Sequence, residues 1–321
     1  MKLKKSTLFY YSLAEMPINI ALFPILVFIP KFYTGEMGVS LALAANIILV
    51  VRIFDVFTDP IVGYINDRTN TRFGKRRPWI VTATPLLMIS IYMLFIPPEG
   101  AGAFHLFSWM FLLSIATTML IIPYYAWGAE LSSDYNERSR ITGWRSISGV
   151  VGSLSAQLIP TIALIFFGLG GSANVLYIVG VASIIIMPLC IFLTVTKVSE
   201  TNNYAQSNTS PIKGLKIMLE NSPFKRLIMA FMFGGIAFSI TIPLYLFFIT
   251  YVLKAEEMAI YMLTFFYVTN IFAVPFWVWL SKKIGKHKAY ICSFGLIAIA
   301  HPFYLLLGEG DFWWMLPITI T

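Results

Sequence analysis

Ionisable residues are scarce in this chain. Only 12% of its 321 residues are Asp, Glu, Lys or Arg, and 58% are apolar, whereas soluble domains carry roughly 25% charged residues. This composition argues against a soluble domain and predicts a polytopic membrane protein. The net charge of +8 does not indicate nucleic-acid binding, because the basic residues stand in short segments between apolar runs, where they set membrane orientation.

Residue types and motifs that carry enzyme chemistry are also few. The two cysteines, Cys190 and Cys292, both stand in apolar runs, so they support neither a disulfide framework nor a zinc site. The 3 histidines are scattered. The chain lacks a GxxxxGK[ST] phosphate loop, an HExxH zinc motif and a GxSxG nucleophile elbow. We therefore predict that the protein is not an enzyme and uses no cofactor other than a coupling ion.

Apolar runs long enough to cross a membrane, about 20 residues each, occupy most of the chain. Six precede a polar segment at 197–226, which reads as a linker, and three follow it. The predicted spans are 7–32, 39–65, 78–97, 104–128, 141–168, 175–195, 227–251, 260–280 and 289–307. Residues 312–321 look like the opening of a tenth span, but ten residues cannot cross ~30 Å of hydrocarbon. We therefore expect the chain to be incomplete.

Basic residues fall on alternate loops, which predicts the orientation. Lysines near the N-terminus precede a run too long for a signal peptide, so this run is predicted to be a retained first span. Twenty of the 23 Lys and Arg residues lie on the side of the N-terminus and the linker, which we therefore place in the cytoplasm. Within the linker, 211–225 has apolar residues on one helical face, and it is either an interfacial helix or a solvated connection.

The most informative stretch is 52–79, RIFDVFTDPIVGYINDRTNTRFGKRRPW. Asp55 and Asp59 lie one helical turn apart on one face, with Arg52 a turn earlier. A charge in hydrocarbon costs at least ~2.5 kcal/mol, so this face should meet the protein interior or a water-filled cavity. Two neighbouring carboxylates also resist being ionised together, so a proton could replace a metal ion there.

A second basic loop repeats this pattern. Residues 275–290, PFWVWLSKKIGKHKAY, again run from an apolar span through a glycine-containing basic loop into the next span. This loop follows the second span after the linker, as the first loop follows the second span of the chain. Two like-oriented halves joined by a cytoplasmic linker are typical of transporters whose site lies between the halves.

Residues 52–79 closely resemble the signature of the glycoside-pentoside-hexuronide:cation symporters, the melibiose-carrier family of the major facilitator superfamily. Phe32-Tyr-Thr with Gly38, PYYAWGAEL at 123–131 and DYNER at 134–138 resemble the same family. The resemblance implies an all-α major facilitator fold of two six-helix bundles, with about nine or ten of twelve spans present here. It suggests an N-terminal bundle at 1–196, a cytoplasmic linker at 197–226 and a partial C-terminal bundle at 227–321. We expect a monomer in the plasma or inner membrane.

Carried over position by position, the resemblance implies a cation site on the second and fourth helices. Its ligands would be Asp55, Thr58, Asp59 and Thr118, with the two carboxylates as the main Na⁺ ligands. Hard cations favour such oxygen donors. The resemblance also implies that motif residues of the cytoplasmic loops, most of them charged, form and break contacts as the halves rock. These are Asp67, Arg68, Arg72, Gly74, Lys75, Arg76, Glu130, Asp134 and Arg138.

The solute side departs from the family pattern. Asn19 and Ile121 stand where melibiose-type carriers have sugar-binding aspartates, which puts galactoside recognition in doubt. Tyr125, Trp127 and Arg145 are candidates for sugar contact, and the alternative for these three is interfacial anchoring.

These features together predict Na⁺- or H⁺-coupled symport of a small organic solute, a glycoside or sugar-like compound. The alternatives are symport of a lysolipid or other amphiphile, and a non-transporting sensor or scaffold. We do not expect the 321 residues alone to transport.

Overall fold

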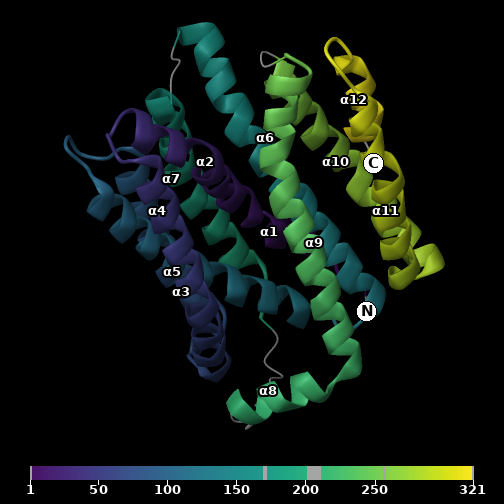
Figure 1. Cartoon of the computed structure of the whole chain (residues 1–321). Coiled ribbons are helices and arrows are strands. Elements are labelled where there is room, and N and C mark those ends of the chain that lie inside the picture. The colour runs from purple at the N-terminus through teal and green to yellow at the C-terminus, as the bar shows by residue number, and fades with distance from the viewer. Residues whose placement is uncertain (1, 169–171, 201–210, 256–257, 320–321) are drawn as a thin grey trace. The chain divides into compact units, whose positions relative to one another are not determined.

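The computed structural model describes residues 2–168, 172–200, 211–255 and 258–319. These residues form helices joined by short loops (Figure 1). In these ranges the β-structure is limited to an isolated bridge between Thr71 and Gly74. The predicted all-α fold class is confirmed, and it follows from the lack of water in a bilayer core, where a helix satisfies its own backbone groups.

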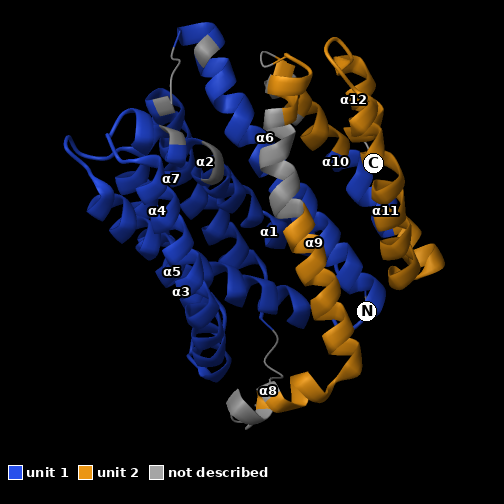
Figure 2. Ribbon diagram, viewed as in Figure 1, with its two compact units in different colours: residues 1–204, 270–278 blue, residues 205–269, 279–321 orange. Residues whose placement is uncertain are grey.

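Two compact units make up the chain, as Figure 2 shows: Met1–Tyr204 with Asn270–Val278, and Ala205–Thr269 with Trp279–Thr321. The helices before the linker are α1 (Lys5–Ser12), α2 (Glu15–Gly35), α3 (Leu41–Arg68), α4 (Arg77–Phe95), α5 (Ala103–Glu130), α6 (Tyr135–Phe167) and α7 (Ser172–Lys197). Those after it are α8 (Pro211–Glu220), α9 (Ser222–Phe247), α10 (Ala259–Ile284), α11 (Lys286–Ala300) and α12 (Met315–Thr319).

Within the described residues, eight helical segments are long and apolar enough to cross a membrane, counting α1 and α2 as one. The protein is therefore a multi-pass membrane protein. The predicted span 227–251 coincides with α9 and a π-helical turn, Phe248–Val252. The structure does not describe some of the side chains of this span. Residues 312–319 form a 3₁₀ turn followed by the short α12.

The first predicted span is divided in two. α1 ends at Ser12 and α2 begins at Glu15, so the break precedes Pro17. Proline has no N–H to donate to the carbonyl four residues earlier, and the Leu13 carbonyl instead accepts from the Met16 amide, 3.3 Å away. Pro24 and Pro30 lie inside α2.

The core of the first unit lies where α2 packs on α6 and α7, α4 on α5 and α7, and α3 on α5. Tyr11 and Tyr124 are fully buried, and each hydroxyl donates to the other residue's carbonyl, at 2.9 and 2.8 Å. This reciprocal pair joins α1 to α5 without leaving a buried hydroxyl unsatisfied.

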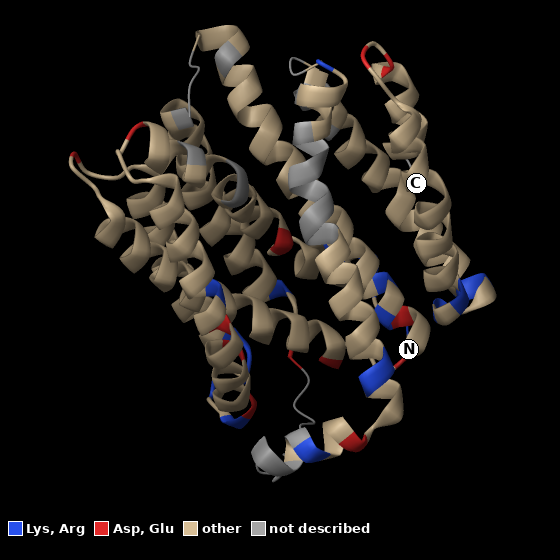
Figure 3. Cartoon of the chain, viewed as in Figure 1, with Lys and Arg blue, Asp and Glu red and all other residues tan. Residues whose placement is uncertain are grey.

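Charge is unevenly distributed along the helices of the first unit. Figure 3 shows blue and red segments gathered near one end of α3–α5. At the other end, the loops 36–40 and 96–102 contain Glu36 and Glu99 but neither Lys nor Arg. This asymmetry is the one that the positive-inside rule requires.

In the second unit, α8 shows that part of the linker is helical. The exposed side chains of this short helix include Ile217, Met218 and Leu219. Its place at a membrane surface stays a prediction, and linker residues 201–210 lie outside the described ranges. Gly285, in the basic loop between α10 and α11, has a φ of +91°, and Gly74 of the first basic loop has a φ of +113°.

Candidate cation site

The two carboxylates of α3 face hydroxyl groups of α5. The Thr118 Oγ1 donates to the Asp59 Oδ1 at 2.7 Å, and the Ser114 hydroxyl donates to the Asp55 Oδ1. The second pair lies one helical turn after the first on both α3 and α5, so the two helices meet in register. Side chains at i and i+4 lie on one face of a helix, which is why the spacing DVFTD produces this arrangement.

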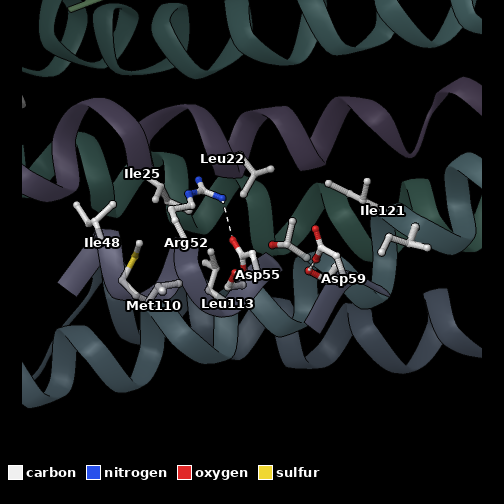
Figure 4. Close-up of a pocket in the computed structure, with 14 residues that line it drawn as sticks. Leu22, Ile25, Ile48, Arg52, Asp55, Asp59, Met110, Leu113 and Ile121 are labelled. Carbon is white, nitrogen blue, oxygen red and sulfur yellow. Dashed lines mark hydrogen bonds and ion pairs between the residues drawn. The ribbon is translucent and has the colours of Figure 1, made fainter. Parts of the chain in front are cut away.

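A cavity of about 280 Å³ lies beside these groups, between α2, α3 and α5. Figure 4 shows Arg52 directed at Asp55, where its Nη1 lies 3.3 Å from the Asp55 Oδ2. The lining residues are Leu22, Ile25, Ile48, Val51, Arg52, Asp55, Asp59, Met110, Leu113, Ser114, Thr117, Thr118, Ile121 and Ile122. The wall is thus mainly apolar with one polar strip.

Of the four predicted cation ligands, the structure brings Asp55, Asp59 and Thr118 to this cavity. Thr58 does not line it, and its hydroxyl lies 3.5 Å from the Asp55 carbonyl on its own helix. The strip offers carboxylate and hydroxyl oxygens, the donors that a hard cation such as Na⁺ favours.

The sequence reasoning missed two cavity hydroxyls, Ser114 and Thr117. The Thr117 Oγ1 is buried without a hydrogen-bond partner, and the residue lines the cavity. Both belong to the stripe Ser114, Thr117, Thr118 and Ile121, whose spacing of three and four residues marks one helix face. That spacing is the signal that could have revealed them.

The first basic loop, residues 69–76 between α3 and α4, forms a charge cluster around Arg76. The Arg76 side chain is 4% exposed. Its Nη2 lies 2.6 Å from the Glu130 Oε1, its Nη1 lies 2.9 Å from the Asp67 Oδ1, and it also contacts the Asn66 amide oxygen. Burial lowers the pKa of Arg76, but Glu130 and Asp67 raise it above its ordinary value. The guanidinium therefore stays charged and joins the ends of α3 and α5.

Other predicted loop residues have more local contacts. Lys75 lies 3.8 Å from Asp67. Arg68 stacks on Tyr64 and Arg72 on Phe73, with guanidinium carbons 4.2 and 4.6 Å from the ring centres.

At the start of α6, Asp134 and Arg138 order the loop that follows α5. The Glu137 and Asn136 amides donate to the Asp134 carboxylate and hold its pKa below the ordinary value. The Arg138 Nε donates to the Ser132 carbonyl at 3.0 Å.

Glu200, which the sequence reasoning did not single out, holds the basic loop from beyond α7. Its Oε1 accepts from the Arg76 and Arg77 amides at 3.0 and 2.7 Å, and its Oε2 accepts from the Lys75 amide at 2.7 Å. A carboxylate at a helix N-terminus satisfies free amides and complements the helix dipole. The basic loop is thereby held at three amides.

The predicted solute residues divide into different environments. Ile121 lines the cation cavity, and the Asn19 Nδ2 donates to the Glu15 carbonyl at 2.9 Å. Tyr125 and Arg145 gather around Glu15, which the sequence reasoning also missed. Trp127 is 1% exposed and packs edge-on against Tyr11, so in this conformation it belongs to the core.

Comparison with known proteins identifies the family of the chain. The pattern of the MFS/sugar transport protein family matches residues 10–320. The chain belongs to this family. The resemblance to glycoside-pentoside-hexuronide:cation symporters in the major facilitator superfamily is confirmed.

Relatives of the chain are named as symporters or transporters. It is 27% identical to the mouse sodium-dependent lysophosphatidylcholine symporter 1 over 88% of its length and 59% of the mouse protein. It is 28% identical to the isoprimeverose transporter of Lactiplantibacillus pentosus, with coverage of 94% and 64%. It is 25% identical to Escherichia coli YagG, named for glycoside/cation symport, with coverage of 86% and 60%. The chain thus spans about three fifths of these relatives' lengths.

Proposed function

We propose that the protein is a secondary transporter, not an enzyme, that couples movement of a small organic solute to a cation by alternating access. The observation that carries this proposal is the pair Asp55 and Asp59, held by α5 hydroxyls at the edge of a cavity. Carboxylates at membrane depth are costly, and those that do occur there typically mark an ion or proton path. Relatives named for sodium-dependent and cation symport support the same conclusion.

In this proposal the cation is Na⁺, with H⁺ as the alternative. Asp55 and Asp59 supply charged oxygens, and Thr118 and Thr117 supply hydroxyl oxygens. Thr58 remains a proposed ligand, although it does not line the cavity in this conformation. The buried Thr117 hydroxyl gains a partner when a cation is present. No other cofactor is part of the proposal.

We propose a glycoside or sugar-like compound as the solute. The polar group formed by Glu15, Tyr125 and Arg145 supports this choice, since it offers a hydrogen-bond acceptor and donors beside an aromatic ring. A lysolipid is the second candidate, because the cation cavity is largely apolar and Ile121 cannot accept a hydrogen bond.

The topology is part of the proposal. We place the N-terminus and the basic loops in the cytoplasm, with bundles at 1–196 and 227–321 joined by the linker 197–226. The protein would act as a monomer in the plasma or inner membrane.

Thermal unfolding of the detergent-purified protein in Na⁺, Li⁺ and K⁺ at several pH values tests the coupling site. A ligand that binds only the folded state at a hundredfold excess over Kd stabilises it by about 2.7 kcal/mol. We expect stabilisation by Na⁺ that Asp59→Asn abolishes and that Glu99→Gln, at an exposed loop carboxylate, retains. A Na⁺ response that survives Asp59→Asn would reject the site.

Uptake by proteoliposomes separates a transporter from a sensor or scaffold of the same fold. In a transporter, an imposed Na⁺ or H⁺ gradient drives accumulation of the solute, and Asp59→Asn abolishes that accumulation. Because the 321 residues alone are not expected to transport, absence of uptake by them does not favour the sensor, whereas accumulation that Asp59→Asn leaves unchanged would reject the coupling.

A further inference from the structure

The short helix α8 in the second unit is apolar along one side. Its sequence, PIKGLKIMLE, has apolar residues at positions 212, 215, 218 and 219 and charged residues at positions 213, 216 and 220. Spacings of three and four residues place each set on its own face of a helix. Ile217 is the one large apolar residue on the charged side. α8 is therefore amphipathic by sequence.

The apolar side of α8 is open. The Met218 side chain is 44% exposed and that of Leu219 is 59% exposed. A helix of 10 residues is marginal in water by itself, and most helical stability in proteins comes from packing of an apolar face. This face therefore requires an apolar environment that the described residues do not supply.

The turn into α9 fixes the direction of α8. The Asn221 amide donates to the Ile217 carbonyl at 3.1 Å, and the Asn221 carbonyl accepts from the Lys225 amide at 3.0 Å. The Asn221 Oδ1 accepts from the Phe224 amide at 3.1 Å, as a helix N-cap does. Figure 1 shows α8 running across the end of α9 and not in line with it. Both helices belong to one compact unit, so this capped residue sets their relative direction.

The depth of α8 follows from where α9 becomes apolar. The predicted span begins at Leu227, directly after Lys225 and Arg226. Asn221 precedes Leu227 by six residues, which is about 9 Å at roughly 1.5 Å per residue. Each headgroup layer of a bilayer is about 5–8 Å thick, since the whole bilayer measures ~40–45 Å and its hydrocarbon core ~30 Å. α8 therefore leaves α9 near the outer edge of the headgroup layer and, running across α9, stays near that depth.

The charges of this segment select the kind of lipid. Residues 211–226 contain four basic residues and one acidic residue, Glu220, and Lys216, Lys225 and Arg226 are exposed. Lys and Arg can extend their charged ends to the headgroups while their stems cover apolar surface. Each basic residue near an anionic leaflet strengthens the attraction about fivefold. A neutral leaflet gives no such gain.

We propose that α8 is an anionic-lipid contact. It lies in the headgroup layer with Met218 and Leu219 toward the acyl chains, and with Lys216, Lys225 and Arg226 against anionic headgroups such as those of phosphatidylglycerol. Lipid is the apolar medium nearest to a face at this depth. The inference is independent of the proposed cation and solute sites, and only the choice of the cytoplasmic leaflet rests on the proposed topology. Anionic lipid thereby holds the end of the linker and the start of α9 at the membrane surface.

Fluorescence quenching of the whole chain in lipid nanodiscs tests the depth of α8. A bimane label is attached to Met218→Cys or, on the charged side, to Glu220→Cys. Both variants carry Cys292→Ser, because Cys292 is exposed whereas Cys190 is buried. We expect a lipid with a doxyl group on its acyl chain to quench the label at 218 at least about twofold more than the label at 220, because interfacial helices bury their apolar face ~5–10 Å deep. Acrylamide in the buffer should show the reverse order.

The lipid composition tests the charge contact. Nanodiscs of phosphatidylcholine alone are compared with an equimolar mixture of phosphatidylcholine and phosphatidylglycerol. We expect the mixture to increase the lipid quenching at 218. Raising the salt to ~1 M, where the screening length is only ~3 Å, should remove that increase.

A matched pair of triple variants assigns the charge effect to α8 and the start of α9. Replacing Lys216, Lys225 and Arg226 together by Gln should abolish the increase caused by phosphatidylglycerol. The control replaces Lys282, Lys283 and Lys288, which are exposed near the second basic loop, by Gln. It removes the same number of charges and should retain the increase. If Met218→Cys does not fold, Leu219→Cys on the same side replaces it.

Three results would overturn the contact. A label at 218 that acrylamide quenches and doxyl lipid does not would make α8 a solvated part of the linker. A label shielded from both quenchers would show that protein covers this face. Lipid quenching that phosphatidylglycerol leaves unchanged, or that both triple variants alter equally, would refute the selection of anionic headgroups. Each result would leave the Na⁺ response at Asp55 and Asp59 untouched, so failure of this proposal is distinguishable from failure of the proposed coupling.

Discussion

Replacing Gly74 by alanine tests how tightly the basic loop is held against Glu200. Gly74 has a φ of +113°, a conformation that L side chains rarely adopt. A Cβ there would lie 2.8 Å from the Glu200 Cδ and closer still to its Oε2. The substitution thus strains the backbone and displaces the carboxylate that accepts from three loop amides.

Each of these effects has a magnitude. Backbone strain of this kind costs about 1–3 kcal/mol, and losing an anion at a helix N-terminus costs about 0.3–2 kcal/mol. Gly74→Ala should therefore cost about 1–5 kcal/mol in all. With about 2–4 °C per kcal/mol for a unit of this size, the unfolding midpoint should fall by roughly 3–20 °C.

Thermal unfolding of a double-mutant cycle separates the two effects. Glu200→Ala removes the displaced group, so Gly74→Ala should cost about 1–2 kcal/mol less in that background. Gly100→Ala is the matched control, since Gly100 has a φ of +78° with no neighbour within 4 Å, and it should show backbone strain alone. Additive losses from Gly74→Ala and Glu200→Ala would refute the contact.

Three further predictions concern the same unit. Thr118→Val should destabilise the protein by about 1–3 kcal/mol because it removes the partner of a cation-site carboxylate, whereas Thr117→Val, which breaks no hydrogen bond, should leave the unfolding midpoint in cation-free buffer unchanged. Arg76→Lys cannot keep the two-pronged contact with its acidic partners and should lower the midpoint, and equal stability would show that a point charge suffices. Asp134→Ala should lower the midpoint at pH 7. That deficit should shrink as the pH falls below the carboxyl's ordinary pKa of about 3.9 and vanish only below its lowered folded-state pKa, because the stabilisation depends on the ionised form.

Some features could be predicted because they depend on local rules. Composition and run length predicted the spanning helices, and the spacing of Asp55 and Asp59 predicted a shared face, since both follow from helix geometry. Helical spacing also suffices to group Ser114, Thr117 and Thr118, although it does not say that this face of α5 meets α3. The undivided span predicted at 7–32 is broken before Pro17 because proline has no N–H to donate to the carbonyl four residues earlier.

The sequence by itself determined the membrane class, the family and the carboxylate pair, because hydropathy and helix period are properties of neighbouring residues. Only the tertiary structure decided which hydroxyls face those carboxylates, that Trp127 is buried, and that Glu15 meets Arg145 across 130 positions of chain. Glu200, more than 120 residues from the loop it holds, is a further case. Contacts between helices depend on how whole faces pack, and no spacing within a single helix encodes that.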